Sequence, residues 1–131
     1  MPESTFDNYK MNKSLGLNWM TAGMSMSPAT ESIEVGGRDM CPWSGACEKS
    51  CLRFAGRNTT AMAKAARQRR TMFRLEELDG FIRLVSGEIE GLKRKAAKEG
   101  MKVAYRPNVL SDDSVFALRL VEANPDVQFY D

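Results

Sequence analysis

Two short apolar runs near the end of the chain, residues 101–105 and 127–130, flank a helical pattern. N-cap candidates at 111–114 open that pattern, and it ends near residue 123. A strand, a helix and a strand within so few residues form a βαβ unit, whose strands lie parallel with a right-handed crossover. Upstream, a further apolar run at 15–20 is a candidate strand, and amphipathic patterns at 60–75 and 78–98 predict helices. We therefore predict one α/β domain with a small, mostly parallel sheet and flanking helices, like part of a βα barrel.

The remaining segments refine this prediction. Residues 1–14 are polar, and we expect a loosely held tail. Residues 32–35 alternate between polar and apolar side chains before two glycines, which predicts a short strand and a turn. The helix at 78–98 has one apolar face, formed by Phe81, Val85, Ile89, Leu92 and Ala96. Since the chain stops at Asp131 directly after a strand, we expect either a longer fold or a second copy of the chain to complete the layers.

All three cysteines, Cys41, Cys47 and Cys51, lie within one loop at 38–57 with the spacing C-x5-C-x3-C. If a helical turn spans 48–54, the last two sulfurs project from one face. Thiolates bind iron–sulfur clusters and zinc, so we predict a metal-binding loop. Three cysteines hold three corners of a 4Fe–4S cubane. Zinc is the alternative, with Asp39, Glu48 or a partner's residue as fourth ligand, and small buried or redox-active thiols are a third possibility.

The amino-acid composition excludes several classes of catalytic and metal site. The chain has no histidine, which excludes Ser-His-Asp and Cys-His catalysis and histidine-containing zinc sites within it. There is no secretory signal and no apolar run long enough to cross a bilayer, so we expect a cytoplasmic protein with no membrane partner. In a reducing compartment a compact cysteine cluster indicates metal binding or catalysis more than disulfides. Methionines at 20, 24, 26 and 40 could supply a thioether ligand, but flexible core filling explains them better.

Basic residues gather on the first predicted helix. Between Arg53 and Arg74 there are seven basic residues and no acidic ones. Their simplest interpretation is a solvated helix face, with Glu76, Glu77 and Asp79 as nearby partners. They could also contact nucleic acid or another anion. The candidate contact residues are Arg57, Lys64, Arg67, Arg70 and Arg74.

A second polar group follows the strand at 101–105. Parallel sheets place ligand sites beyond the carboxyl ends of their strands. We therefore predict that Arg106, Asn108 and Asp112 contact a cofactor, Arg106 as an anion partner and the other two through hydrogen bonds. Capping of the following helix by Ser111 or Asp112 is the structural alternative.

The cysteine loop, the Gly56-Arg57 pair, the Arg-Pro-Asn and Ser-Asp elements at 106–112 and the Phe-Tyr-Asp strand end resemble the phage-encoded gene product 88 family. The resemblance covers the chain from about residue 15 and implies a viral protein in the host cytoplasm, but it implies no activity. Family members continue beyond the last strand, so this chain resembles a shortened version. The layout is in turn similar to radical S-adenosylmethionine enzymes, although their C-x3-C-x2-C spacing and a glycine-rich motif for the methionine cofactor are both missing here.

Two functional hypotheses follow. The first is an iron–sulfur-binding phage protein that acts in electron transfer, in regulation or as a remnant of a radical enzyme, and that self-associates. The second is a host-takeover or counter-defence protein that binds a host protein or nucleic acid through the basic helix, with structural zinc or thiols. Whether either is an enzyme is left open by the sequence.

Overall fold

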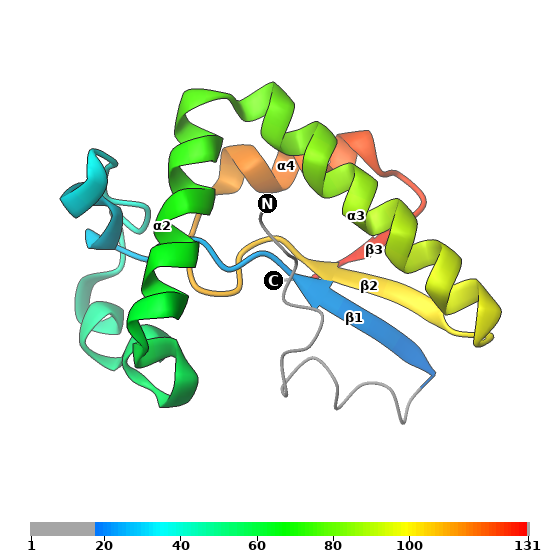
Figure 1. Ribbon diagram of the computed structural model, residues 1–131, viewed down its shortest axis with the longest axis horizontal. Helices are drawn as coiled ribbons and strands as arrows, with labels where there is room; N and C mark the ends of the chain where they lie inside the picture. Colours follow the sequence, from blue (N-terminus) through cyan, green and yellow to red (C-terminus); the bar gives the residue numbers. More distant parts are fainter. Residues whose placement is uncertain (1–17, 131) are drawn as a thin grey trace.

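The computed structural model describes residues 18–130, so the predicted tail at 1–14 and the first part of the strand at 15–20 lie outside the described residues. The chain forms a three-stranded parallel sheet with flanking helices, which confirms the predicted α/β class (Figure 1). Strand order follows the sequence: β1 (Trp19–Gly23), β2 (Lys102–Arg106), β3 (Gln128–Phe129). The helices are α2 (Ala61–Glu76), α3 (Leu78–Lys98) and α4 (Ser114–Ala123).

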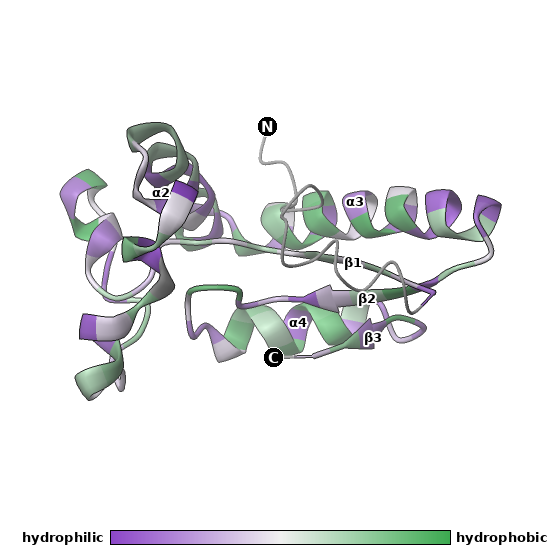
Figure 2. Cartoon of the chain, turned by 90° about the horizontal axis from the view of Figure 1, so that it is seen from below, coloured by the Kyte–Doolittle hydropathy of each residue, from purple (hydrophilic) through white to green (hydrophobic). Residues whose placement is uncertain are grey.

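Helices α3 and α4 pack against each other and cover the same face of the sheet (Figure 1). Register explains which strand residues they cover. Met20 lies opposite Val103 and Ala22 lies opposite Tyr105, and paired residues of neighbouring strands point to the same face. Those side chains join the apolar cluster beneath the two helices. Hydrophobic and hydrophilic residues alternate along α3 in Figure 2, as an amphipathic helix requires.

The predicted apolar face of α3 is confirmed, because all five of its residues are buried in the core. The aromatic rings of Phe81 and Phe116 lie 5.3 Å apart between their centroids and join α3 to α4. Met20, Met24, Met26 and Met40 are also buried, which confirms that these methionines fill the core. By contrast Met62, on α2, is 82% exposed.

The strand predicted at 32–35 is wrong, because Glu31–Val35 forms a 3₁₀ helix, η2. The alternation there does not follow burial, because the polar Ser32 is buried while the apolar Ile33 and Val35 are exposed. Gly36 closes the turn in a left-handed conformation (φ 93°) and donates its N–H to the Ile33 carbonyl. The turn is held from outside by Gln68, whose side-chain amide donates to the Glu31 carbonyl at 3.0 Å. A tertiary contact therefore overrides the local pattern.

Helix α2 stands across the carboxyl ends of the strands, beside the loops that leave β1 and β2 (Figure 1). Its N-cap is Thr60, whose hydroxyl accepts a hydrogen bond from the Ala63 N–H at 3.1 Å. Among residues 18–130, no helix is both long and apolar enough to cross a membrane.

Candidate metal centre

The loops that follow β1 and β2 are joined by backbone hydrogen bonds at the carboxyl edge of the sheet. The Met24 N–H donates to the Arg106 carbonyl at 3.0 Å, and the Val109 N–H donates to the Met24 carbonyl at 3.2 Å. The start of the cysteine loop attaches to both. The Met40 N–H donates to the Ala29 carbonyl at 2.8 Å, and the Met40 carbonyl accepts from Asp112 at 3.2 Å. Cys41 is thereby placed where parallel sheets carry their ligand sites.

Cys41 is half-buried and held on several sides. Its N–H donates to the Asp39 carboxylate at 2.9 Å, and its sulfur lies 3.8 Å from the Leu110 carbonyl oxygen. Burial raises the pKa of the Cys41 thiol, and the negative charges of Asp112 and Cys51 add to the rise. Hydrogen bonds from the backbone N–H groups of Ala29 and Asp112 lower the pKa of the same thiol in part. The sulfur therefore sits beside two amides that could donate to a bound thiolate.

Cys47 and Cys51 lie farther out, on a chain of short 3₁₀ turns. These turns are η3 (Gly45–Ser50), η4 (Leu52–Phe54) and η5 (Gly56–Thr59). The predicted helical turn at 48–54 is wrong, because η3 ends at Ser50 and Cys51 has an extended backbone (φ −59°, ψ 139°). The two sulfurs therefore do not share one face of an α-helix. Cys47 is exposed and Cys51 is half-buried.

We define the cysteine segment as residues 41–60. Every residue of it whose burial is described is exposed or half-buried, including Trp43 at 90% and Phe54 at 59% exposure. All three cysteines are free thiols. Within the described part of the chain, no three cysteine, aspartate or glutamate side chains lie close enough together to hold a metal ion. Among the side chains of this segment that the structure describes, none is therefore held by full burial, and the three sulfurs are not gathered around one point.

The basic helix faces inward at two of its predicted contact residues. Arg67 and Arg74 are 3% and 7% exposed, so the expected solvated face is wrong for both. Arg67 donates twice to the Glu31 carboxylate, at 2.7 and 2.9 Å. Arg74 donates twice to Asp113, with the longer bond at 3.1 Å. The partners are therefore two distant carboxylates and not the expected acidic residues at 76–79.

The other basic candidates divide between loop contacts and the surface. Arg70 donates to the Ser25 carbonyl at 3.1 Å, and Lys64 pairs with the Glu34 carboxylate at 2.8 Å. Arg57 is exposed. A nucleic-acid contact stays a prediction, and the surface offered for it is that of Arg57, Lys64 and the exposed Arg69.

The three residues predicted after β2 have different environments. Asn108 is buried, and its side-chain oxygen accepts from the Ser111 hydroxyl and the Asp113 N–H, both at 3.1 Å. It therefore shapes the loop at 107–113. Arg106 is half-buried at the end of β2. Asp112 is exposed beside Cys41. Asp113, one of the N-cap candidates at 111–114, caps α4 by accepting from the Phe116 N–H at 3.1 Å, so Ser111 and Asp112 are not the cap.

Sequence reasoning missed the long-range pairings that position this edge. Glu31 and Asp113 anchor the two arginines, and Thr71 accepts from the Ser27 N–H at 2.8 Å. Ala29 was missed as well. It has a left-handed backbone (φ 45°), which is rare for a residue with a side chain. The two arginine–carboxylate pairs and the Ser27–Thr71 contact join residues that are 36 to 44 positions apart, so no local pattern reveals them.

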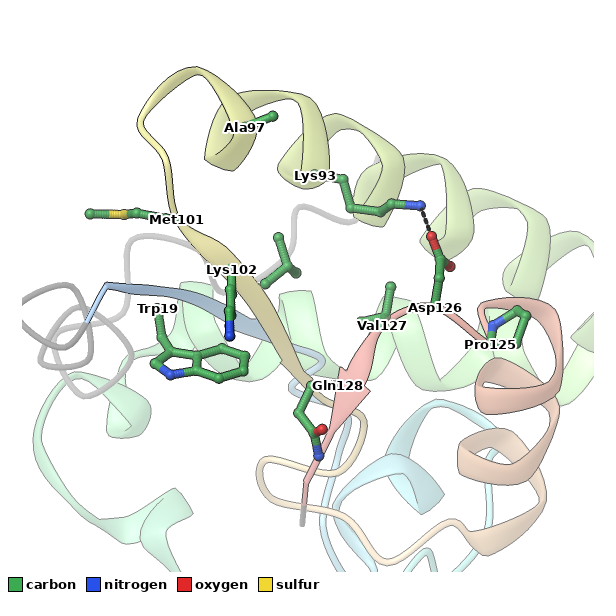
Figure 3. Close-up of a pocket in the computed structure, with 10 residues that line it drawn as sticks. Trp19, Lys93, Ala97, Met101, Lys102, Pro125, Asp126, Val127 and Gln128 are labelled. Atoms are coloured by element: carbon green, nitrogen blue, oxygen red, sulfur yellow. Dashed lines mark hydrogen bonds and ion pairs between the residues drawn. The ribbon is translucent and has the colours of Figure 1, made fainter.

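A separate hollow lies at the opposite, amino-terminal edge of the strands (Figure 3). Its volume is about 450 Å³. Lys93 pairs there with Asp126, and the Lys102 ammonium lies 5.7 Å from the centre of the Trp19 ring. The hollow is lined by no cysteine, so the candidate metal centre and this hollow are distinct.

Comparison with known proteins identifies the family. Residues 3–131 match the family described as gene product 88. No curated protein and no solved structure matches the chain. The match covers nearly the whole sequence and agrees with the resemblance of the cysteine loop and the strand ends. The chain therefore belongs to the gene product 88 family.

Proposed function

We propose that this protein binds an iron–sulfur cluster, a 4Fe–4S cubane, through Cys41, Cys47 and Cys51. The supporting observation is the contrast within the cysteine segment. One sulfur is fixed at the carboxyl edge of the sheet, while the rest of the segment has no buried side chain among those described. A segment without buried side chains needs another interaction to fix its conformation. Metal binding can do this, because the free energy of metal binding contributes to folding.

The donor set fits the group. Three thiols within one short segment can supply three cluster ligands, and a fourth position can come from elsewhere. The amides of Ala29 and Asp112 beside the Cys41 sulfur are suited to donate to a ligating thiolate, and such bonds tune the cluster's reduction potential. Because the sulfurs are not gathered, Cys47 and Cys51 would have to move toward Cys41. Their exposed 3₁₀ turns leave room for that movement.

The role that we propose for the cluster is electron transfer or regulation in the host cytoplasm. When bound, an iron–sulfur cluster supplies one-electron redox chemistry. The chain's own part is to hold Cys41 and its amides on a rigid edge, so that the site keeps its surroundings in both redox states. A more specific alternative to electron transfer or regulation is radical S-adenosylmethionine chemistry at the cluster. Cleavage of S-adenosylmethionine by the reduced protein would support that alternative, and its absence would leave electron transfer or regulation.

The test is anaerobic purification followed by visible absorption and measurement of iron, acid-labile sulfide and zinc per chain. We expect visible charge-transfer absorption with stoichiometric iron and sulfide. Cys47→Ser should remove the colour and the iron. Ser50→Ala, an exposed change in the same 3₁₀ helix, is the matched control and should keep both. Zinc in place of iron would identify the alternative cofactor. A folded, colourless protein with neither metal would overturn the proposal.

The contacts of α2 give less support to the second hypothesis, binding of a host macromolecule through a basic helix. Arg67 and Arg74 are occupied by buried carboxylates, and Lys64 pairs with Glu34. Salt-sensitive binding of nucleic acid or a host protein that survives all three Cys→Ser changes would favour this hypothesis nonetheless. Self-association likewise stays a prediction, which sedimentation of the purified chain would test.

A further inference from the structure

An apolar groove of about 750 Å³ lies on the outer side of α2, where η2 packs against that helix. We call it the α2 groove. Its apolar lining is formed by Val35, Ala65, Met72 and Phe73. Val35 is 47% exposed and Met72 is half-buried, so the described fold leaves this lining partly open to solvent. None of the three cysteines lines the α2 groove, which is therefore distinct from the candidate metal centre.

The α2 groove follows one face of the helix. Residues with the spacing i, i+4, i+7 and i+11 lie above one another on a helix, and here they are Ala65, Arg69, Met72 and Glu76. Arg69 and Glu76 are two turns apart, about 10 Å along the helix axis. The groove therefore has a basic residue toward one end, an acidic residue toward the other and Met72 between them.

The charged residues at the rim of the groove are unpaired. Arg69, Glu76 and Glu77 are all exposed, and within residues 18–130 their side chains make no hydrogen bond or ion pair. Other charges of α2 do pair, as Lys64 does with Glu34. An apolar groove with opposite unpaired charges at its two ends fits an occupant that carries the same charges in the reverse order.

We propose that the α2 groove binds a second copy of this chain, with the two α2 helices antiparallel about a twofold axis. In such an interface the same patch of each copy meets its counterpart. Arg69 and Glu76 are equally far from the midpoint between residues 72 and 73. An axis there places Arg69 of each copy opposite Glu76 of the other and puts Met72 and Phe73 at the centre of the contact. The groove is thus its own charge complement. This inference is independent of the proposed metal centre.

The experiment measures the dissociation constant of the dimer by sedimentation of the full chain over a range of concentrations, at low ionic strength, where charges are least screened. Arg69→Glu places like charges opposite each other at both ends of the contact and should raise the dissociation constant about tenfold or more. Glu76→Arg should do the same. Arg94→Glu, an exposed reversal on α3 outside the groove, is the matched control and should stay close to the wild-type value. Circular dichroism checks that each variant keeps its fold.

Net charge and specific pairing are separated by the direction of the effects. Arg69→Glu lowers the net charge of the chain and Glu76→Arg raises it, so a general charge effect would move the two dissociation constants in opposite directions. Specific pairing weakens both dimers. The double variant Arg69→Glu/Glu76→Arg has the wild-type net charge and exchanges the two partners, so it should regain the wild-type dissociation constant.

Single variants that dimerise as tightly as the wild type would overturn the inference, because the dimer would then use another surface. A double variant as weak as either single one would overturn it as well. A wild type that stays monomeric at millimolar concentration would contradict self-association altogether and leave the α2 groove to a helix of another protein. None of these results would affect the three-cysteine site.

Discussion

Helices α2 and α3 follow each other along the chain and are held in the fold by opposite means. The side chains that α3 buries are all apolar: Phe81, Ile82, Val85, Ile89, Leu92, Ala96. The side chains that α2 buries are all polar: Arg67, Gln68, Thr71, Arg74. Only Glu77 separates the two helices. Neighbouring helices of one small domain thus use two different kinds of packing.

The difference has a physical meaning for the candidate site. Apolar burial is non-directional, so α3 stabilises the sheet without fixing any particular loop. Bidentate arginine–carboxylate pairs are directional and specify geometry as well as energy. Through them α2 ties Glu31, before the cysteine segment, and Asp113, beside Asp112, to one rigid element. We infer that α3 supplies stability, whereas α2 supplies the relative position of the loops that carry Cys41.

The largest predicted effect is on α3. Phe81→Ala removes a fully buried ring that contacts Phe73 and Phe116. It should lower the free energy of unfolding by about 4 kcal/mol, from lost transfer energy and a residual cavity. Urea denaturation followed by circular dichroism measures this. Arg83→Ala, exposed on the same helix, is the control and should change stability by less than about 0.5 kcal/mol. Equal losses of stability in Phe81→Ala and Arg83→Ala would contradict the conclusion that apolar burial holds α3 in the fold.

A slightly smaller effect is predicted on α2, with a different signature. Arg67→Met should cost about 3 kcal/mol, because it leaves the buried Glu31 carboxylate without its partner. Adding Glu31→Leu should recover most of that loss, since well-packed apolar residues can replace a buried pair. Arg69→Met, exposed on the same helix, is the control. If the double variant is as unstable as Arg67→Met alone, the loss of stability does not come from an unpaired Glu31 carboxylate, and the expected recovery is contradicted.

The cap that joins the cysteine segment to α2 is a third test. Thr60→Ala removes the hydroxyl that accepts from the Ala63 N–H, and should cost about 1 kcal/mol. Thr60→Ser keeps the acceptor and should keep the stability. Thermal unfolding measures both variants. No difference between them would mean that α2 is held by its buried arginines alone, which would sharpen the contrast with α3.

The smallest effect concerns reactivity and leaves stability unchanged. Burial raises the pKa of Cys41, so its reactive thiolate should be scarce near neutral pH and should form at higher pH than for an ordinary thiol. Cys47 is exposed. In metal-depleted protein, iodoacetamide should therefore modify Cys47 several-fold faster than Cys41, as followed by peptide mass spectrometry. Faster modification of Cys41 would contradict the protected position assigned to it.

Local patterns in the sequence predicted the long helices, the order of the last strands and the apolar face of α3. Residues 78–98 were predicted as a helix from their apolar period, and Leu78–Lys98 is helical with the expected face buried. The βαβ order of 101–130 and its parallel pairing were also predictable, because short chain connections restrict topology. The cysteine spacing identified the candidate metal ligands, and the family match covers the segment that contains them.

Only the tertiary structure decided which way the basic helix faces and what surrounds Cys41. Arg67 and Arg74 pair with carboxylates 36 and 39 residues away. The spacing of basic residues along a helix does not indicate whether such distant partners exist. The contact of Gln68 with the Glu31 carbonyl likewise holds Glu31–Val35 as a 3₁₀ helix, where a strand was expected at 32–35. A backbone hydrogen bond from the Asp112 N–H to the Met40 carbonyl brings Asp112 beside Cys41. Local spacing encodes which residues share a face, whereas long-range charge pairing determines what that face meets.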